Sequence, residues 1–228
     1  MALARIPAHD PSTPRDIAAF AAGLVGTIIR PGDQAYDTVP LVHDRAFDRH
    51  PSLIVKAASA ADVARTVVFA RDACLELAVR GGSHSLVGFC TSEGGIVLDL
   101  SAMKGLHIDP ERRLAWAQAG LTAGEYTAAA GAHGLATPFG DTGSVGPSGL
   151  TLGGGIGWLV RKHGLAIDAL VSVEIVTADG RLLTASEREH RHLFWAMRRG
   201  GGSFGVVTRF QFRLYPVGTI VGGSAAAS

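Results

Sequence analysis

Short runs of apolar residues alternate with segments of helical periodicity along most of this 228-residue chain. The apolar runs are bounded by glycine, proline or polar residues, as buried strands are. The other segments carry apolar residues three or four positions apart, as amphipathic helices do. We expect strands at 53–55, 77–80, 96–100, 106–108, 114–117, 171–177, 181–184 and 206–215, and helices at 16–25, after 59, after 122 and at 192–197. This order of elements predicts an α+β protein.

Two of the predicted helices have a recognisable start signal. Ser59 is followed three positions later by Asp62, and Thr122 is followed in the same way by Glu125. In such a capping box each side chain bonds the backbone N–H of the other residue, which satisfies donors that the first helical turn leaves free. Gly134 follows the second helix and is expected to end it, because glycine readily takes the conformation found after the last helical turn.

A predicted hairpin near residue 105 divides the chain into two units. Its strands flank Asp109-Pro110-Glu111-Arg112, a turn with proline at the second position. A small βαβ-type unit precedes the hairpin, and a larger α+β unit with a long glycine run follows it. We therefore predict a lead-in at residues 1–50, a first subdomain at 51–104, a second subdomain at 105–216 and a flexible tail at 217–228.

Glycine accounts for 30 residues, and the glycines are clustered beside predicted strands and helices. Such clusters are typical of loops whose backbone approaches a ligand closely. The first cluster is Arg80-Gly81-Gly82-Ser83-His84-Ser85, in which both glycines are expected to take positive φ so that successive N–H groups converge on an anion such as phosphate. No helical pattern follows, which excludes the dinucleotide and Walker motifs. A glycine-rich turn with a structural histidine is the alternative.

The second cluster runs from Gly140 to Gly157 and leaves few large side chains in between. Thr142, Ser144 and Ser148 offer neutral donors and acceptors along this run, which suits a flat or extended polar ligand. A flexible insertion is the alternative, although apolar residues interleaved with the glycines favour packed order. A ligand that contacts both clusters is expected to lie in the crevice between the two units.

Charge and cysteine content argue against several other functions. The 21 Lys and Arg nearly balance the 20 Asp and Glu, so we expect no binding to nucleic acid or to an acidic membrane. Cys74 and Cys90 are too few for a disulfide framework and are both expected to be buried. The histidines lack metal-ligand spacing, so no metal site is expected.

Without a secretory pattern or a membrane-spanning run, the protein is predicted to be cytoplasmic. Core or crevice-wall positions are expected for Trp116, Trp158 and Trp195.

Five motifs together resemble the FAD-linked oxidases whose FAD-binding domain is of the vanillyl-alcohol-oxidase (PCMH) type, in particular the berberine-bridge-enzyme-like branch. The motifs lie, in the order of that family, at residues 80–85, 94–101, 143–157, 163–168 and 193–207. The resemblance covers residues 51–216. It implies a PCMH-type fold of two α+β subdomains with FAD in the crevice between them, the diphosphate against the first glycine loop and the isoalloxazine near the second.

The resemblance also implies the site residues. His84 matches the histidine that carries flavin through its 8α carbon, and a neutral imidazole is a suitable nucleophile for that carbon. Some members form a second link to a cysteine, but Thr142 stands at that position, so a single histidyl link is expected. No catalytic residue is identified. The predicted cofactor-binding residues are Arg80, Gly81, Gly82, Ser83, His84, Ser85, Gly88, Thr142, Gly143, Ser144, Gly149, Gly153, Gly154, Gly157, Gly205 and Val207.

Three functions fit these residues. The first is the FAD-binding portion of an oxidase that takes hydride from an alcohol or amine carbon of a small-molecule substrate and passes electrons to molecular oxygen. The second is a flavin-binding module or fragment without activity of its own. The third is noncovalent FAD binding for reduction by NADPH, as in the related enolpyruvyl reductases. Family members continue past the position of Pro216 into a substrate domain, so we expect a missing C-terminal domain or a partner chain to complete the active site.

Overall fold

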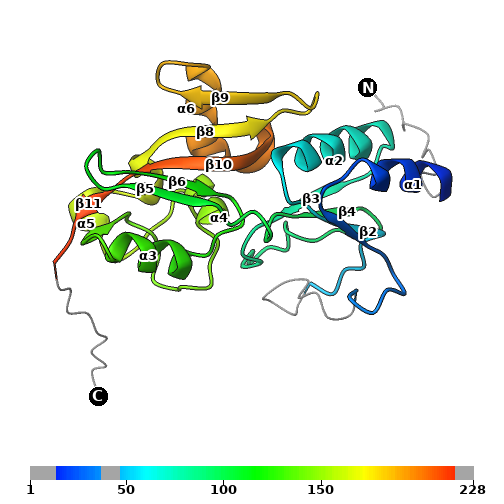
Figure 1. Ribbon diagram of the computed structural model, residues 1–228, viewed down its shortest axis with the longest axis horizontal. Helices are drawn as coiled ribbons and strands as arrows, with labels where there is room; N and C mark the ends of the chain where they lie inside the picture. The colour runs from blue at the N-terminus through cyan, green and yellow to red at the C-terminus, as the bar shows by residue number, and fades with distance from the viewer. Residues whose placement is uncertain (1–13, 37–46, 219–228) are drawn as a thin grey trace, which may run out of the picture.

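The computed structural model describes residues 14–36 and 47–218, and within them two main sheets lie next to each other (Figure 1). The first sheet contains, in spatial order, β1 (Thr27–Ile29), β2 (Leu53–Lys56), β4 (Ile96–Asp99) and β3 (Leu77–Arg80). The second contains β5 (Leu106–Asp109), β6 (Leu114–Gln118), β10 (Val206–Arg213), β8 (Leu170–Val176) and β9 (Leu182–Ser186). A short ladder pairs β11 (Tyr215–Pro216) with β7 (Leu135–Ala136).

Helices cover these sheets and connect their strands. The α-helices are α1 (Pro14–Ala22), α2 (Ala60–Asp72), α3 (Ala123–Gly131), α4 (Pro147–Leu152), α5 (Val160–His163) and α6 (Arg191–Gly200). The 3-10 turns are η1 (Ala166–Ala169) and η2 (Gly201–Phe204). The helix α2 connects β2 to β3, while α3 and α4 lie below the second sheet in the view of Figure 1. The mixture of helices and sheets confirms the predicted α+β class.

The first sheet brings the ends of β3 and β4 together. Both β2 and β3 pair with β4 in parallel, and Arg80 at the end of β3 is in register with Asp99 at the end of β4. All four residues of β4 are buried, as expected for the central strand of a parallel arrangement. The first glycine loop therefore begins where β4 leaves the first sheet for the second.

The second sheet is antiparallel throughout and shares its core with the first. Phe212 of β10 is fully buried, and its ring lies edge-on to the rings of Tyr126 and Phe139, with centroids 5.9 and 5.1 Å away. Leu98 of the first sheet and Val173 of the second belong to the same cluster of buried apolar residues. The chain passes from the first sheet to the second between β4 and β5, near residue 105, where the boundary between the two units was predicted.

Both predicted capping boxes are present, but the ends of the two helices differ from expectation. The helix α3 ends at Gly131, before Gly134, which lies beyond the last turn with a φ of +66°. Cys74 lies outside α2 with a φ of +54° and is exposed, so its predicted burial is wrong, whereas Cys90 is buried as predicted. The apolar face of α2 stops before Cys74 because the chain turns away from the core after Ala73.

Several other predictions also need correction. Trp158 and Trp195 are 68% and 70% exposed, so neither is a core residue, whereas the alternative of a crevice-wall position stays a prediction. The glycine run at 140–157 contains the short helix α4, and the strand β1 falls in the segment predicted as an extended lead-in. The terminal strand prediction is divided between β10 and β11, because Leu214 separates them. Residues 1–13 and 37–46 of the lead-in and 219–228 of the tail lie outside the described residues.

Asp62 joins the lead-in to α2. Its carboxylate accepts hydrogen bonds from the backbone N–H groups of Val25, Gly26, Ala58 and Ser59 at 2.8 to 3.1 Å. Burial by itself raises the pKa of this carboxyl group, but the N–H donors outweigh burial and leave the pKa of Asp62 below its usual value. The folded state therefore favours the ionised carboxylate.

We expect Asp62→Asn to remove a pH-dependent part of the stability. Because the folded-state pKa is depressed, the carboxylate stabilises the fold above the unfolded pKa of about 4, and this contribution is lost as the pH falls through the folded pKa. The variant is expected to lose about 1–3 kcal/mol of unfolding free energy near neutral pH and less at acidic pH. Urea unfolding at neutral and at acidic pH measures the loss of unfolding free energy under each condition. Asp72→Asn, on the exposed end of α2, is the control. If Asp62→Asn lost the same unfolding free energy at every pH, the ionised carboxylate of Asp62 would not be the source of the stability.

Candidate functional site: two glycine loops that meet at His84

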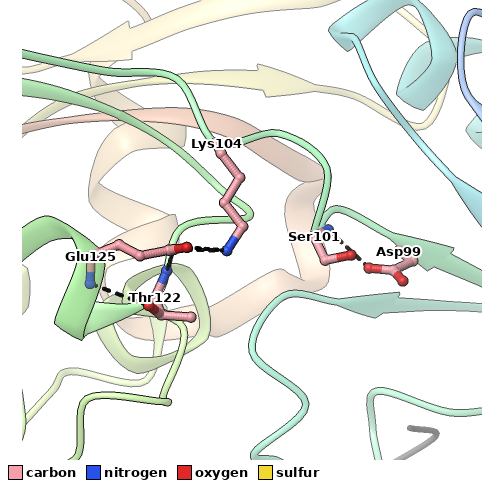
Figure 2. Close-up of polar contacts among 5 residues, drawn as sticks. All are labelled: Asp99, Ser101, Lys104, Thr122 and Glu125. Atoms are coloured by element: carbon pink, nitrogen blue, oxygen red, sulfur yellow. Dashed lines mark hydrogen bonds and ion pairs between the residues drawn. The ribbon is translucent and has the colours of Figure 1, made fainter. Parts of the chain in front are cut away.

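The first glycine loop, residues 81–88, is anchored at its base by a buried ion pair. The Arg80 guanidinium donates to the Asp99 carboxylate at 2.9 Å, and these two side chains are only 2% and 8% exposed. The other oxygen of Asp99 accepts the backbone N–H of Ser101 at 2.8 Å, as Figure 2 shows. Arg80 therefore directs its side chain into the protein interior, where it holds the end of β3 to the end of β4.

The connection from β4 to β5 is held to the start of α3 by a second, more exposed set of contacts (Figure 2). Lys104 pairs with both oxygens of Glu125 at 2.6 and 2.7 Å, and Glu125 also accepts the backbone N–H of Thr122. Burial raises the pKa of Glu125, but the contacts with Lys104 and Thr122 together outweigh burial and leave the pKa below its usual value. These contacts fasten the link between the two sheets to the start of α3.

The main chains of the two glycine loops contact each other directly. A Cβ atom built on Gly82 would lie 2.2 Å from the backbone nitrogen of Gly146, and one on Gly146 would lie 2.6 Å from the nitrogen of Gly82. A Cβ on Gly81 would lie 2.7 Å from Oγ of Ser148, which donates to the carbonyl of Ala119. These distances are shorter than any that side chains adopt, so glycine is required for the two loops to touch.

This close approach corrects the predicted role of the first glycines. Gly81 and Gly82 do not have positive φ; the left-handed conformation falls instead on Ser83, with a φ of +62°, and on Gly88, with +71°. Serine tolerates this region less well than glycine, so the bend at Ser83 is a locally strained position. Gly81 and Gly82 allow contact with the second loop, and Ser83 makes the bend in the chain.

His84 connects the two loops through its side chain. Its Nε2 atom lies 3.0 Å from Oγ of Ser144, although the two residues are sixty positions apart in the chain. The imidazole is half-buried, whereas Ser144 and its neighbour Gly143 are exposed. The structure therefore places the predicted nucleophile at the junction of both glycine clusters, within reach of solvent and of a ligand.

The junction offers hydrogen-bond donors that the protein does not use. Among the described residues, the backbone N–H groups of Gly81, Gly82 and Ser83 donate to no protein acceptor. A Cβ built on Gly149 or Gly154 meets nothing within 4 Å, so the second loop borders open space. Unpaired amides beside bare main chain fit an anionic, extended group such as the diphosphate of FAD, because an anion satisfies donors without requiring side chains.

The remaining predicted site residues take three kinds of position. Ser85 and Thr142 use their hydroxyl groups locally, with Ser85 accepting from the N–H of Phe89 and Thr142 donating to Asp141. Gly153 is exposed in the second loop. The others are packed: Gly88 lies against Phe47, Gly157 against the carbonyl of Phe139, Gly205 against the carbonyl of Val176, and Val207 is buried in β10. Contact of these residues with a cofactor stays a prediction.

Two residues that shape the site were missed in the sequence. Asp99 fixes the base of the first loop, and Gly146 lets the second loop approach it. Two consecutive predicted strands each end near a charged residue, first Arg80 and then Asp99, and this repeated pattern could have suggested the pair. Nothing in the sequence separates Gly146 from the other glycines of the run, because its role depends on a contact with a distant segment.

Large apolar side chains lie exposed in the segments that carry the two loops. Leu86, Val87 and Phe89 follow His84 and are 77%, 54% and 79% exposed, and Ile156, near the end of the second loop, is 73% exposed. Exposed apolar groups of this size are typical of surfaces that another part of a protein covers. Two grooves of about 600 and 620 Å³ lie elsewhere, one lined by α1, α2 and the β8–β9 turn and the other by the second sheet and α6.

Other kinds of site find no support in the described part of the chain. No group of three His, Cys, Asp or Glu residues there is arranged to hold a metal ion. No helix within residues 14–36 and 47–218 has the length and apolar character needed to cross a bilayer.

Comparison with known proteins identifies this arrangement. The family model described as an FAD binding domain matches residues 51–186. The (R)-6-hydroxynicotine oxidase of Paenarthrobacter nicotinovorans is 41% identical over 192 residues, which cover 84% of this chain and 42% of the relative. An FAD-linked oxidoreductase of Aspergillus terreus is 36% identical over 209 residues, covering 90% and 42%. The chain thus spans less than half the length of these relatives.

Solved structures agree with the sequence matches. The crystal structure of 6-hydroxy-D-nicotine oxidase from Arthrobacter nicotinovorans superposes with a TM-score of 0.83 at 40% identity, covering 85% of this chain and 43% of that one. A berberine-bridge-enzyme-like protein of Physcomitrella patens gives 0.83 at 30% identity, with coverage of 87% and 44%. These matches confirm the predicted PCMH-type fold of the FAD-linked oxidases. The chain therefore belongs to the family of FAD-binding domains.

Proposed function

We propose that this chain is the FAD-binding portion of an oxidase, and that His84 carries the flavin through a single covalent bond. The observation that supports this most strongly is the position of His84. Its ring bonds Ser144 where the two glycine loops touch, beside the unpaired N–H groups of residues 81–83. A nucleophilic imidazole and a set of anion-binding amides are thus available to one extended ligand.

Each part of the junction has a distinct role in this proposal. The amides of residues 81–83 bind the diphosphate, and the open main chain around Gly149 and Gly154 accommodates the rest of the cofactor. His84 forms the covalent bond to the flavin end. Thr142 stands where some family members have the cysteine of a second bond, so no second bond forms in this proposal. When bound, FAD supplies the acceptor for a hydride from the substrate. The ion pair of Arg80 and Asp99 keeps the first loop in place.

We infer the substrate class and partners from the relatives. Solved relatives are named as oxidases of 6-hydroxy-D-nicotine and of xylooligosaccharide, which supports oxidation of an amine or alcohol carbon in a small molecule, with molecular oxygen as acceptor. A substrate domain, contributed by further sequence or by a partner chain, covers the flavin in this proposal. The exposed Leu86, Phe89 and Ile156 beside the loops favour such a cover. A cytoplasmic location stays a prediction.

The alternative is a flavin-binding module without activity of its own. The chain covers 42% of the (R)-6-hydroxynicotine oxidase, and the groups that orient a substrate are not identified within it. Both proposals require flavin binding; they differ in whether the chain turns over substrate once a substrate domain is supplied. Oxygen consumption by the chain mixed with the corresponding second half of a relative distinguishes them.

Titration of the purified, flavin-free chain with FAD in the His84→Ala background, where the proposed covalent bond cannot form, tests the binding claim by flavin fluorescence. Gly82→Ala in this background is expected to weaken binding. The new methyl group would clash with the backbone of Gly146, so the loops must separate, at a cost typical of overpacking that corresponds to about tenfold or more in the dissociation constant. Gly131→Ala is the matched control, because a Cβ there meets nothing within 4 Å. Wild type that binds no FAD, or equal affinity for both variants, would contradict the proposed junction.

A further inference from the structure

The hydroxyl group of Ser144 is committed to His84. It lies 3.0 Å from Nε2 of the imidazole and has no other hydrogen-bond partner among residues 14–36 and 47–218. The serine is exposed, so the bond makes little contribution to the core. A surface hydroxyl that bridges two loops to reach one imidazole is better explained by a role in the chemistry of that imidazole.

The geometry of the loops makes this contact a fixed one. Gly82 and Gly146 touch through their main chains, and each lies two positions from one member of the pair. The separation of His84 and Ser144 is therefore determined by the backbone and not by the adjustment of long side chains. Such pre-organisation is what a reacting group requires, because small errors in its orientation slow a reaction strongly.

We propose that Ser144 is a positioning residue for covalent attachment of flavin at His84. This inference rests on the proposed function, since it requires that the attachment takes place. In the attachment, a bond forms between an imidazole nitrogen and the 8α carbon of the flavin, while one C–H bond of that carbon and the imidazole N–H bond break. The two protons and two electrons pass to molecular oxygen, which is reduced to hydrogen peroxide, and the flavin ends oxidised.

The hydroxyl group suits this step because it can both donate and accept. It holds the neutral imidazole before the bond forms, and it can accept from the ring N–H as positive charge develops on the imidazole. The ring must keep one orientation while its charge changes, and an alanine at this position has no group that could hold it. A threonine retains the hydroxyl group at the same distance from the backbone.

The test is the rate at which FAD becomes covalently attached to the purified, flavin-free chain, measured by intact mass at successive times after FAD is added. Ser144→Ala is expected to slow attachment about tenfold, which corresponds to the loss of one positioned hydrogen bond, and Ser144→Thr is expected to restore most of the rate. The affinity for FAD before attachment is measured by fluorescence in two proteins that cannot form the bond, His84→Ala and the double variant His84→Ala with Ser144→Ala. We expect the two affinities to be equal. Thr127→Ala removes an exposed hydroxyl on α3 as the matched control.

The outcomes separate this inference from the proposed function. Wild type that takes up FAD without a covalent bond overturns the histidyl link and the role of Ser144 together. Attachment at equal rates in wild type and Ser144→Ala overturns only the role of Ser144. A Ser144→Ala chain that binds FAD more weakly to the same extent that it reacts more slowly also overturns it, because the serine would then be a binding residue. Slow attachment with normal affinity, rescued by threonine, supports it.

Discussion

Replacing His84 by alanine is expected to abolish acid-stable flavin completely. Only an imidazole nitrogen at this junction is available in the proposal to form the bond to the 8α carbon, and Thr142 stands where a second link would require a cysteine. Precipitation of wild type with acid should leave a yellow pellet, whereas the His84→Ala pellet should be colourless. Intact mass spectrometry of both proteins measures the same difference without relying on colour.

The His84→Ala variant should still bind FAD without a covalent bond. The amides of Gly81, Gly82 and Ser83 and the contact between the loops do not depend on the imidazole, since Gly82 meets Gly146 through the main chain. His133→Ala, at an exposed position after α3, is the matched control and should retain acid-stable flavin. Acid-stable flavin on His84→Ala would show that another residue carries the link.

Local patterns predicted most of the fold because they reflect interactions close in sequence. The capping boxes at Ser59 and Thr122 marked two helix starts, and the apolar runs marked the strands of both sheets except β1. Helix ends were less well predicted, since α3 stops before Gly134. The exposure of Trp158 could not be read from its type, because an apolar side chain becomes exposed or buried according to what distant segments cover it.

In the candidate site, too, features set by neighbouring residues were predicted and features set by distant segments were not. The loop with His84 was recognisable, and so was the run with Ser144, because glycine clusters and small hydroxyl residues are visible in one dimension. The reason for the glycines was predicted wrongly: Gly81 and Gly82 avoid a clash with the other loop and do not supply positive φ. Close approach between segments sixty residues apart is a property of the fold, and no local pattern encodes it.

The ion pair at the base of the first loop leads to the second large effect, on stability. We expect Asp99→Ala to lower the free energy of unfolding by about 3–5 kcal/mol, because it leaves the buried Arg80 guanidinium without the carboxylate that it contacts at 2.9 Å. It also removes the acceptor for the N–H of Ser101. Urea unfolding followed by circular dichroism measures this loss.

Burial of the pair is what makes the effect large, and a second aspartate tests that reasoning. Asp72 pairs with Arg71 at 2.7 Å, closer than the buried pair, but these side chains are 62% and 49% exposed. Water and salt screen such a pair, so Asp72→Ala is expected to cost less than about 1 kcal/mol. If the two variants were destabilised equally, burial would not be the cause. Since Arg80 directly precedes Gly81, Asp99→Ala should also weaken FAD binding, whereas Asp72→Ala should leave it unchanged.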